Sequence, residues 1–332
     1  MSMLTRFYSF LWRILCCLLL VVMICSAAWA TYPGKNGRIA FVAKFTGTWQ
    51  LYTVRPDGTD LFQVTNLPPT DFFFWVPDYS PDGRRIVFSH DMSGAPEIYV
   101  INVDGTGLAQ LTNDGGEDIF ARWSPDGRYI TFASLFIDDR FFYHHLVTMR
   151  DDGSDRKLIT NVLFDDAGAS YTPDGEHLIF GSNRRSLIAA LWSSKANGSQ
   201  AKQLTAPALE GGCPDVSPDG KLLTFCSQIN TPLVSSIWIG NLDGNHLERL
   251  TNPEEINAVA PNFSPDGRQI VFNGAAPVDG PFQMYIMNAD GSGLRLALSC
   301  PDVGCAFPDW GPQPRELKCM IRIMTALDLE TL

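Results

Sequence analysis

One short stretch, Trp123-Ser124-Pro125-Asp126-Gly127, recurs along the chain and constrains its fold more than any other feature. Each copy predicts a tight turn, because proline fixes φ at the second turn position, aspartate favours the third, and glycine adopts the left-handed conformation that lets the chain return antiparallel. Strand-like residues flank every copy. The hydroxyl residues of the five copies are 44 to 48 residues apart, at Ser80, Ser124, Thr172, Ser217 and Ser264. A period in that range is typical of a repeat array.

A second tight turn follows about twenty residues after the first in each repeat. Asp-Gly and Asn-Gly pairs are strong hairpin signals. These pairs begin at Asp57, Asp104, Asp152, Asn197, Asp243 and Asp290. Two hairpin turns divide each repeat into four strands, so the sequence predicts an all-β fold, a six-bladed β-propeller of four-stranded antiparallel blades. A β-sandwich fits the even spacing less well.

The two ends of the repeat array are expected to pair. The first strand-like segment has no turn partner before it, and Trp310 at the other end has no strand after it. We expect residues 38–65 and 306–310 to share one composite blade, which would close the ring and leave no exposed sheet edge.

Residues 1–30 have the pattern of an export signal, with Arg6 and Arg13 ahead of an apolar run and small residues at Ala28 and Ala30. The run is eleven residues long, which is too short to span a bilayer. The alternative is an uncleaved anchor. The sequence therefore predicts three segments, the signal at 1–30, the propeller at 31–312 and a tail at 313–332, and a periplasmic or extracellular monomer without a membrane span after cleavage.

The charge of the chain disfavours nucleic acid as a partner. Two of the 25 basic residues and none of the 36 acidic ones precede position 31, so the chain after cleavage would carry a net charge of −13. Nucleic-acid-binding surfaces are basic.

With the repeats laid out, the chain resembles the TolB-like β-propeller family over about residues 34–312. The resemblance is carried by Ser-Pro-Asp-Gly followed by an Ile-x-Phe strand, then an Ile-Tyr-x-x-Asn strand, Asp-Gly and Leu-Thr. It implies an exported, non-enzymatic scaffold in the cell envelope that binds a protein or peptide partner, such as an envelope lipoprotein. We expect this chain to lack the additional α/β domain that precedes the propeller in TolB itself, so it could perform only the docking part of that role.

A propeller has two unlike faces. The regular turns lie on one, here called the turn face, and their aspartates are explained by turn chemistry. The other, here called the irregular face, carries loops of varied length, where binding residues are expected on a rigid scaffold. Its loops are acidic, and each of the six that enter an inner strand carries a carboxylate. The candidate binding residues are Asp71, Asp114, Glu117, Asp118, Asp165, Asp166, Glu210, Glu254, Glu255 and Asp302.

Three interpretations of these carboxylates are possible. They belong to ordinary solvated loops, they form a docking surface for a basic partner, or they hold a divalent cation at the axis. Calcium takes carboxylate oxygens, but its sites need oxygens that converge, which a sequence does not reveal. We therefore predict no cofactor, with calcium as the alternative. The alternative function is a metal-assisted hydrolase or lyase with its site at the propeller channel. No catalytic residues are predicted, because no nucleophile, base and orienting group form a recognisable set.

Five cysteines follow the signal segment, and an exported protein can form disulfides. If Val216 faces Leu223 across the turn, Cys213 and Cys226 lie directly opposite each other and are predicted to form a disulfide. A bulge at Gly220 would instead put them on opposite faces and leave two free thiols. Cys300 and Cys305 are the other candidate pair, and Cys319 would be left over.

Overall fold

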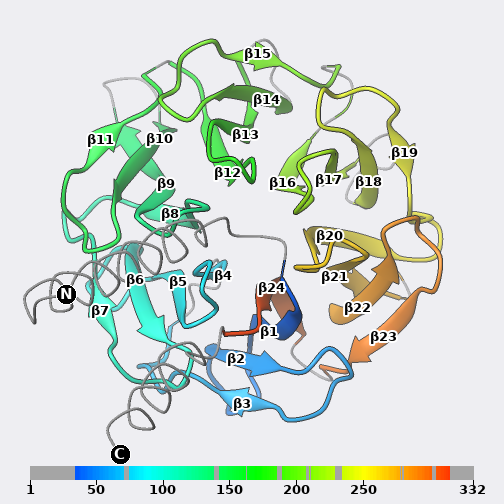
Figure 1. The fold of residues 1–332 in the computed structure, drawn as a ribbon. Coiled ribbons are helices and arrows are strands. Elements are labelled where there is room, and N and C mark those ends of the chain that lie inside the picture. Colours follow the sequence, from blue (N-terminus) through cyan, green and yellow to red (C-terminus); the bar gives the residue numbers. More distant parts are fainter. Residues whose placement is uncertain are drawn as a thin grey trace, which may run out of the picture.

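The computed structural model describes residues 34–314 except 71–74, 138–141, 162, 185–188, 207–208, 210, 229–233, 277, 279 and 301–303. Within this range six antiparallel sheets of four strands surround a central axis (Figure 1). The predicted six-bladed β-propeller is confirmed. The predicted signal segment and residues 315–332 of the tail lie outside the described residues. In the described part of the chain, no helix has the length and apolar character that a membrane span requires.

The strands of each blade are given from the axis outward. Blade 1 contains β24 (Cys305–Pro312), β1 (Asn36–Ala43), β2 (Gln50–Val54) and β3 (Phe62–Gln63). Blade 2 contains β4 (Asp78–Tyr79), β5 (Arg85–His90), β6 (Glu97–Asn102) and β7 (Ala109–Gln110). Blade 3 contains β8 (Asp118–Trp123), β9 (Tyr129–Ile137), β10 (Phe142–Arg150) and β11 (Lys157–Leu158).

The remaining three blades follow the same order. Blade 4 contains β12 (Asp166–Tyr171), β13 (His177–Ser182), β14 (Ala190–Lys195) and β15 (Lys202–Gln203). Blade 5 contains β16 (Gly212–Val216), β17 (Leu222–Ser227), β18 (Ser236–Asn241) and β19 (Glu248–Arg249). Blade 6 contains β20 (Asn257–Phe263), β21 (Gln269–Ala275), β22 (Gln283–Asn288) and β23 (Arg295–Leu298).

Blade 1 closes the ring as the open ends of the repeat array predicted. Strand β24 pairs antiparallel with β1, with Trp310 opposite Ile39 and Asp309 opposite Ala40. In Figure 1 the red β24 lies beside the blue β1 at the axis. The prediction of a composite blade is therefore confirmed.

Hydrogen bonds explain why the repeated turn has its sequence. In every copy the hydroxyl of the first residue donates to the aspartate Oδ1 over 2.6–2.7 Å. That oxygen also accepts the backbone N–H two residues later, and the hydroxyl accepts the N–H five residues after itself. The turn glycines have φ between +68° and +72°. The turn aspartates are therefore used within the turns, as predicted.

A hydrogen bond within each blade also explains why the Leu-Thr pair recurs. In five blades the threonine hydroxyl accepts a backbone N–H of the third strand over 2.9–3.0 Å. These threonines are Thr65, Thr112, Thr160, Thr205 and Thr251. All are buried, so each hydroxyl satisfies a backbone donor that water does not reach.

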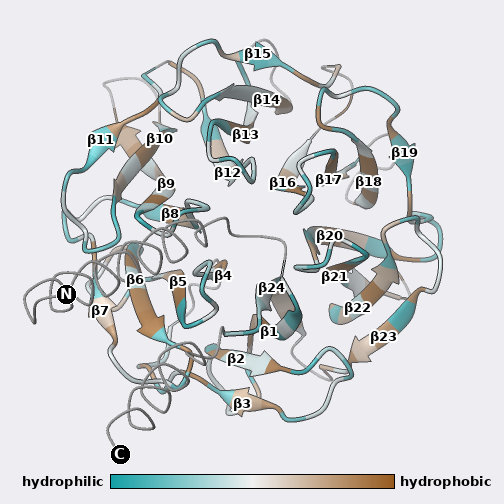
Figure 2. Ribbon diagram, in the orientation of Figure 1, coloured by the Kyte–Doolittle hydropathy of each residue, from teal (hydrophilic) through white to brown (hydrophobic). Residues whose placement is uncertain are grey.

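The core lies between neighbouring blades. One phenylalanine of the second strand of each blade is fully buried, namely Phe41, Phe88, Phe132, Phe180, Phe225 and Phe272. Figure 2 shows a largely hydrophobic β6, whereas β15 and β19 at the rim are hydrophilic. The hydrophobic residues between the blades thus hold the blades together.

One disulfide expectation needs correction. Val216 lies opposite Leu223 as predicted, but the register shifts by one residue between Asp215 and Gly212, so Cys226 faces Gly212. The prediction that Cys213 lies directly opposite Cys226 is wrong, and both cysteines are free thiols. The cause is a bulge within β16, because a bulge sets two residues against one and ends the simple ladder. The structure joins Cys300 to Cys305 by a disulfide. Cys319 lies outside the described residues.

Candidate functional site

The inner strands are bulged near the irregular face, and the bulges form a ring at the channel mouth. Register shifts occur in β8, β12, β16 and β20, and between β24 and β1. One residue from each blade has φ between +34° and +63°: Val76, Phe120, Gly168, Cys213, Ala260 and Phe307. Five of the six are not glycine, and left-handed backbone at such residues costs energy and recurs at functional sites.

These residues line a cavity of about 410 Å³ on the axis. Its wall is mainly apolar and includes Pro77, Pro261 and Pro308, while Arg122, Asp165 and Asn183 supply polar groups. A mainly apolar cavity of this size with few polar groups is the usual form of a binding site. The channel mouth is thus the first candidate site in the described part of the molecule.

Deeper in the channel, one residue per blade forms a second ring, here called the axial ring. Its members lie two residues before the first residue of each repeated turn, or before Gly311 in blade 1. They are Asp78, Arg122, Ser170, Asp215, Asn262 and Asp309. Arg122 borders both the mouth cavity and the narrower space of about 40 Å³ within this ring.

The axial ring connects each blade to the next. Asp78 accepts the backbone N–H of Trp123 over 2.7 Å, and Asp309 accepts that of Tyr79 over the same distance. Asp215 and Asn262 accept the corresponding N–H groups of the next blades over 2.8 and 3.1 Å. Four of the six members therefore accept a backbone N–H across a blade boundary.

The axial ring has three carboxylates but one guanidinium. Arg122 lies 3.1 Å from Asp78, and burial raises the pKa of Asp78 against the opposing charge of Arg122. Burial raises the pKa of Asp215 to about 7 and that of Asp309 well above its usual range, and the charge of Asp78 adds to both shifts. The ring therefore holds protons at pH values where ordinary carboxyls are ionised.

The structure separates the predicted loop carboxylates into buried and exposed ones. Asp118 and Asp166 have fully buried side chains that pair with Arg156 at 3.0 Å and Arg184 at 2.6 Å. Burial raises the pKa of Asp118 to about 6, although a Ser134 hydrogen bond and Arg156 oppose the shift. These two carboxylates connect strands and do not offer a surface to a partner.

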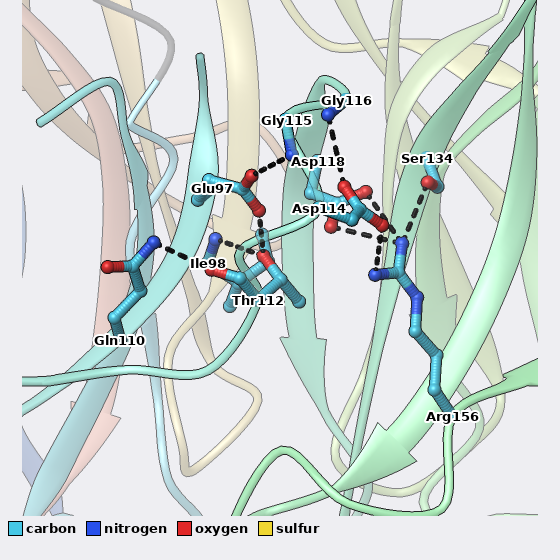
Figure 3. A network of polar contacts seen from close by, with 10 residues as sticks. All are labelled: Glu97, Ile98, Gln110, Thr112, Asp114, Gly115, Gly116, Asp118, Ser134 and Arg156. Carbon is cyan, nitrogen blue, oxygen red and sulfur yellow. Dashed lines mark hydrogen bonds and ion pairs between the residues drawn. The ribbon is translucent and has the colours of Figure 1, made fainter. Parts of the chain in front are cut away.

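Asp114 belongs to the network drawn in Figure 3. The Arg156 guanidinium is 2.6 Å from Asp114 and also donates to Asp118 and Ser134. On the other side, buried Glu97 accepts the Thr112 hydroxyl and the Gly115 N–H. The carboxylates of Glu97, Asp114 and Asp118 are close enough to share an ion, but Arg156 already neutralises two of them. This group fits an ion-pair network better than a calcium site.

Glu117 and Asp165 flank a histidine at the boundary of blades 3 and 4. His144 Nδ1 is 2.8 Å from Asp165, and Nε2 is 3.5 Å from Glu117. Burial lowers the pKa of His144, but the hydrogen bond and charge of Asp165 and the charge of Glu117 outweigh it, so the pKa lies above its usual value. The same hydrogen bond lowers the pKa of Asp165.

Glu254 and Glu255 are exposed on a turn before β20, where the Glu255 carboxylate accepts the Asn252 amide over 3.0 Å. Asp71, Glu210 and Asp302 lie outside the described residues. The predicted residues therefore do not form one array. They divide into buried ion pairs, a histidine clamp and an exposed acidic turn.

The sequence interpretation missed one feature, the axial ring. The axial ring could have been found by aligning the position two residues before each repeated turn. The β9–β10 hairpin has nine residue pairs, whereas the second and third strands of the other blades form five or six. Ile137 and Phe142 at its end are 66% and 73% exposed, and Leu163 in the loop before β12 is 72% exposed.

Comparison with known proteins now gives the family. The model described as the TolB beta propeller domain matches residues 24–211, which is more than half of the chain. The chain belongs to the TolB β-propeller family. The comparison with curated proteins finds no match.

Solved structures agree on the fold of this TolB-family propeller. TolB from Acinetobacter baumannii has a TM-score of 0.69 at 23% identity, over 85% of this chain and 68% of that one. A putative TolB from Agrobacterium tumefaciens has a TM-score of 0.62 at 19% identity, over 79% of this chain and 88% of that one. Hydrazine synthase from Kuenenia stuttgartiensis has a TM-score of 0.68 at 15% identity, over 87% of this chain and 50% of that one. One fold thus serves unlike functions, so function must be argued from the site.

Proposed function

We propose that this TolB-family propeller is an exported, non-enzymatic scaffold of the cell envelope that binds a protein or peptide partner through its irregular face. The observation that carries the proposal is the contrast between the faces. The turn face is built from repeated turns whose carboxylates are satisfied internally. The irregular face carries the long β9–β10 hairpin with exposed apolar side chains, the exposed acidic turn and the apolar channel mouth.

An interface of this composition suits a partner that presents apolar side chains beside basic ones. Apolar anchors supply most of the binding energy in protein interfaces, whereas charges at the rim mainly set the association rate and the choice of partner. The net charge of −11 for the whole chain also favours a basic partner. Export, a periplasmic location and a lipoprotein partner belong to this proposal.

The test is capture from a cell-envelope extract with the purified propeller, with bound proteins identified by mass spectrometry. Replacing Ile137 and Phe142 by serine should lower capture of a specific partner at least about tenfold, since these are exposed anchors. Glu254→Lys with Glu255→Lys should slow association and reduce its dependence on salt. The matched control is Glu176→Lys with Glu248→Lys, two exposed carboxylates away from the irregular face.

All variants should melt within a few degrees of the wild type, because Ile137 and Phe142 are largely exposed and surface charges contribute little to stability. Capture that survives both sets of irregular-face changes but fails in the control variant would show that the wrong face had been chosen.

A further inference from the structure

Two cysteines without a disulfide are neighbours across the β16–β17 pair of blade 5, because Cys213 follows Gly212, the residue directly opposite Cys226. Cys213 lies in the bulge of β16 with φ +49°, and its side chain is exposed. Since Cys213 also lines the mouth cavity, this exposure is toward the channel. Cys226 on β17 is partly buried, and its Sγ is 3.3 Å from the carbonyl oxygen of Gly212, the residue directly opposite it.

The two thiols differ in how readily they ionise. The neighbouring Cys226 side chain lowers the pKa of Cys213, the position of Cys213 within the channel wall opposes this, and the charge of Arg122 lowers the pKa further. The same contact and burial raise the pKa of Cys226 well above its usual value. A negative charge is thus stabilised on the thiol that faces the channel, while its partner keeps the proton. Reactive cysteines have this pattern of access, a nearby cation and a second thiol.

We propose that Cys213 is a site of reversible thiol modification at the channel mouth and that Cys226 is its resolving thiol. The co-reactant is a low-molecular-weight disulfide. The Cys213 thiolate attacks one sulfur of that disulfide, so a bond from Cys213 Sγ to that sulfur forms, the reagent's S–S bond breaks, and one thiolate leaves.

The second step returns the channel to an adduct-free state. Cys226 gives its proton to solvent and attacks Cys213 Sγ, which forms the Cys213–Cys226 bond and releases the second small thiolate. The protein dithiol has lost two electrons and the small disulfide has gained two. This oxidised state is reversible. It differs from the structural disulfide that the register predicted, because both thiols are free in the structure and the bulge moves Cys213 away from the position directly opposite Cys226.

The position of Cys213 gives the modification a consequence. A small thiol attached there would occupy part of the 410 Å³ cavity and restrict access to Arg122 until Cys226 displaces it. Cys300 and Cys305 do not compete for the reagent, because they are already joined and both are buried. The inference concerns the channel wall itself and does not depend on the identity of a binding partner.

The test uses the full-length protein, oxidised glutathione as the probe, and peptide mapping by mass spectrometry to identify each modified cysteine. In the wild type the expected product is the Cys213–Cys226 disulfide, with little adduct remaining. In Cys226→Ser a stable glutathione adduct should accumulate on Cys213. In Cys213→Ser the Cys226 thiol should stay unmodified, and a Cys226 adduct formed there as fast as on wild-type Cys213 would overturn the proposal.

A second measurement separates reactivity from simple access. The rate of Cys213 alkylation by iodoacetamide should rise with pH to a midpoint below the ~8.5 of an unperturbed thiol, and the midpoint should move upward in Cys226→Ala, which has no polar side-chain atom beside Cys213. N-acetylcysteine is the unperturbed reference, and thermal melting checks that each variant is folded, with Cys226→Ala as the replacement if Cys226→Ser is not. The proposal is overturned by a wild-type midpoint at or above the reference, or by an adduct as persistent in the wild type as in Cys226→Ser.

Discussion

Replacement of Asp215 by asparagine is expected to change how the stability of the propeller depends on pH. Asp215 Oδ2 accepts the Phe263 N–H of the next blade over 2.8 Å, and an asparagine oxygen can accept the same bond. The substitution therefore keeps the connection between blades 5 and 6 and removes the titration. It also exchanges the 3.4 Å bond that the Ser170 hydroxyl donates to Asp215 for one that the new amide can donate to the hydroxyl, a change that does not depend on pH. Any difference between wild type and variant that changes with pH reports the ionisation of this ring carboxyl.

The direction and size of this pH dependence follow from the raised pKa of Asp215. Burial raises the pKa of Asp215 from 3.8 to about 7, so between these pH values the folded protein holds a proton that the unfolded chain has lost. The contribution of Asp215 to stability is fully present below about pH 4 and is lost as the pH rises through 7. The difference between 3.8 and about 7 corresponds to about 4 kcal/mol in total, of which about 3 kcal/mol falls between pH 5 and 8. Solvent in the channel reduces this, so we expect a change of about 2–3 kcal/mol over that pH range.

The assay is urea unfolding of wild type and Asp215→Asn at pH 5, 6, 7 and 8. The variant should gain on the wild type as the pH rises and should be the more stable protein at pH 8. Asp219→Asn is the matched control, because a Ser217 hydrogen bond lowers the pKa of this turn aspartate and places its titration below the range. If the free-energy difference between wild type and Asp215→Asn were the same at every pH, the argument about the axial ring would be refuted.

Three further predictions concern closure, the threonines and the histidine clamp. A chain ending at Gly304 lacks β24 and should aggregate, whereas a monomeric, cooperatively folding product in ultracentrifugation would contradict the closure of blade 1. Thr205→Val leaves the buried Leu191 N–H without its 3.0 Å acceptor and should cost about 1–3 kcal/mol in urea unfolding, with Thr205→Ser costing less. By NMR, His144 should titrate above its usual pKa and shift downward in Asp165→Asn, so its contribution to stability is lost as the pH rises through the folded value; an unchanged titration would exclude the clamp.

The fold was readable from the sequence because its determinants are local. The hydroxyl and the aspartate of each repeated turn form hydrogen bonds within five residues of the sequence. The five copies can therefore be recognised from the sequence without the tertiary structure. The buried phenylalanines and the unpaired ends then fix the number of blades and the composite closure. Strand alternation carries this information because side chains repeat every two residues along a strand.

The site was only partly readable, because its determinants are long-range. Whether Asp118 is a free carboxylate depends on Arg156, which lies 38 residues away in the sequence and reaches it only after the strands of blade 3 have paired. The axial ring joins residues of neighbouring blades up to 230 positions apart, as between Asp309 and Tyr79.

The cysteine pair is the clearest case in which the sequence did not determine a contact. The facing of Val216 and Leu223 followed from the turn, but a one-residue bulge three positions further along β16 moved Cys213 out of register. A register shift of one residue changes the face of the sheet on which a side chain lies. No residue of the hairpin indicates this shift in the sequence. The sequence alone therefore determined the six blades and how they close, whereas the packing of six inner strands around one axis decided which polar side chains meet, since those contacts exist only once the ring is closed.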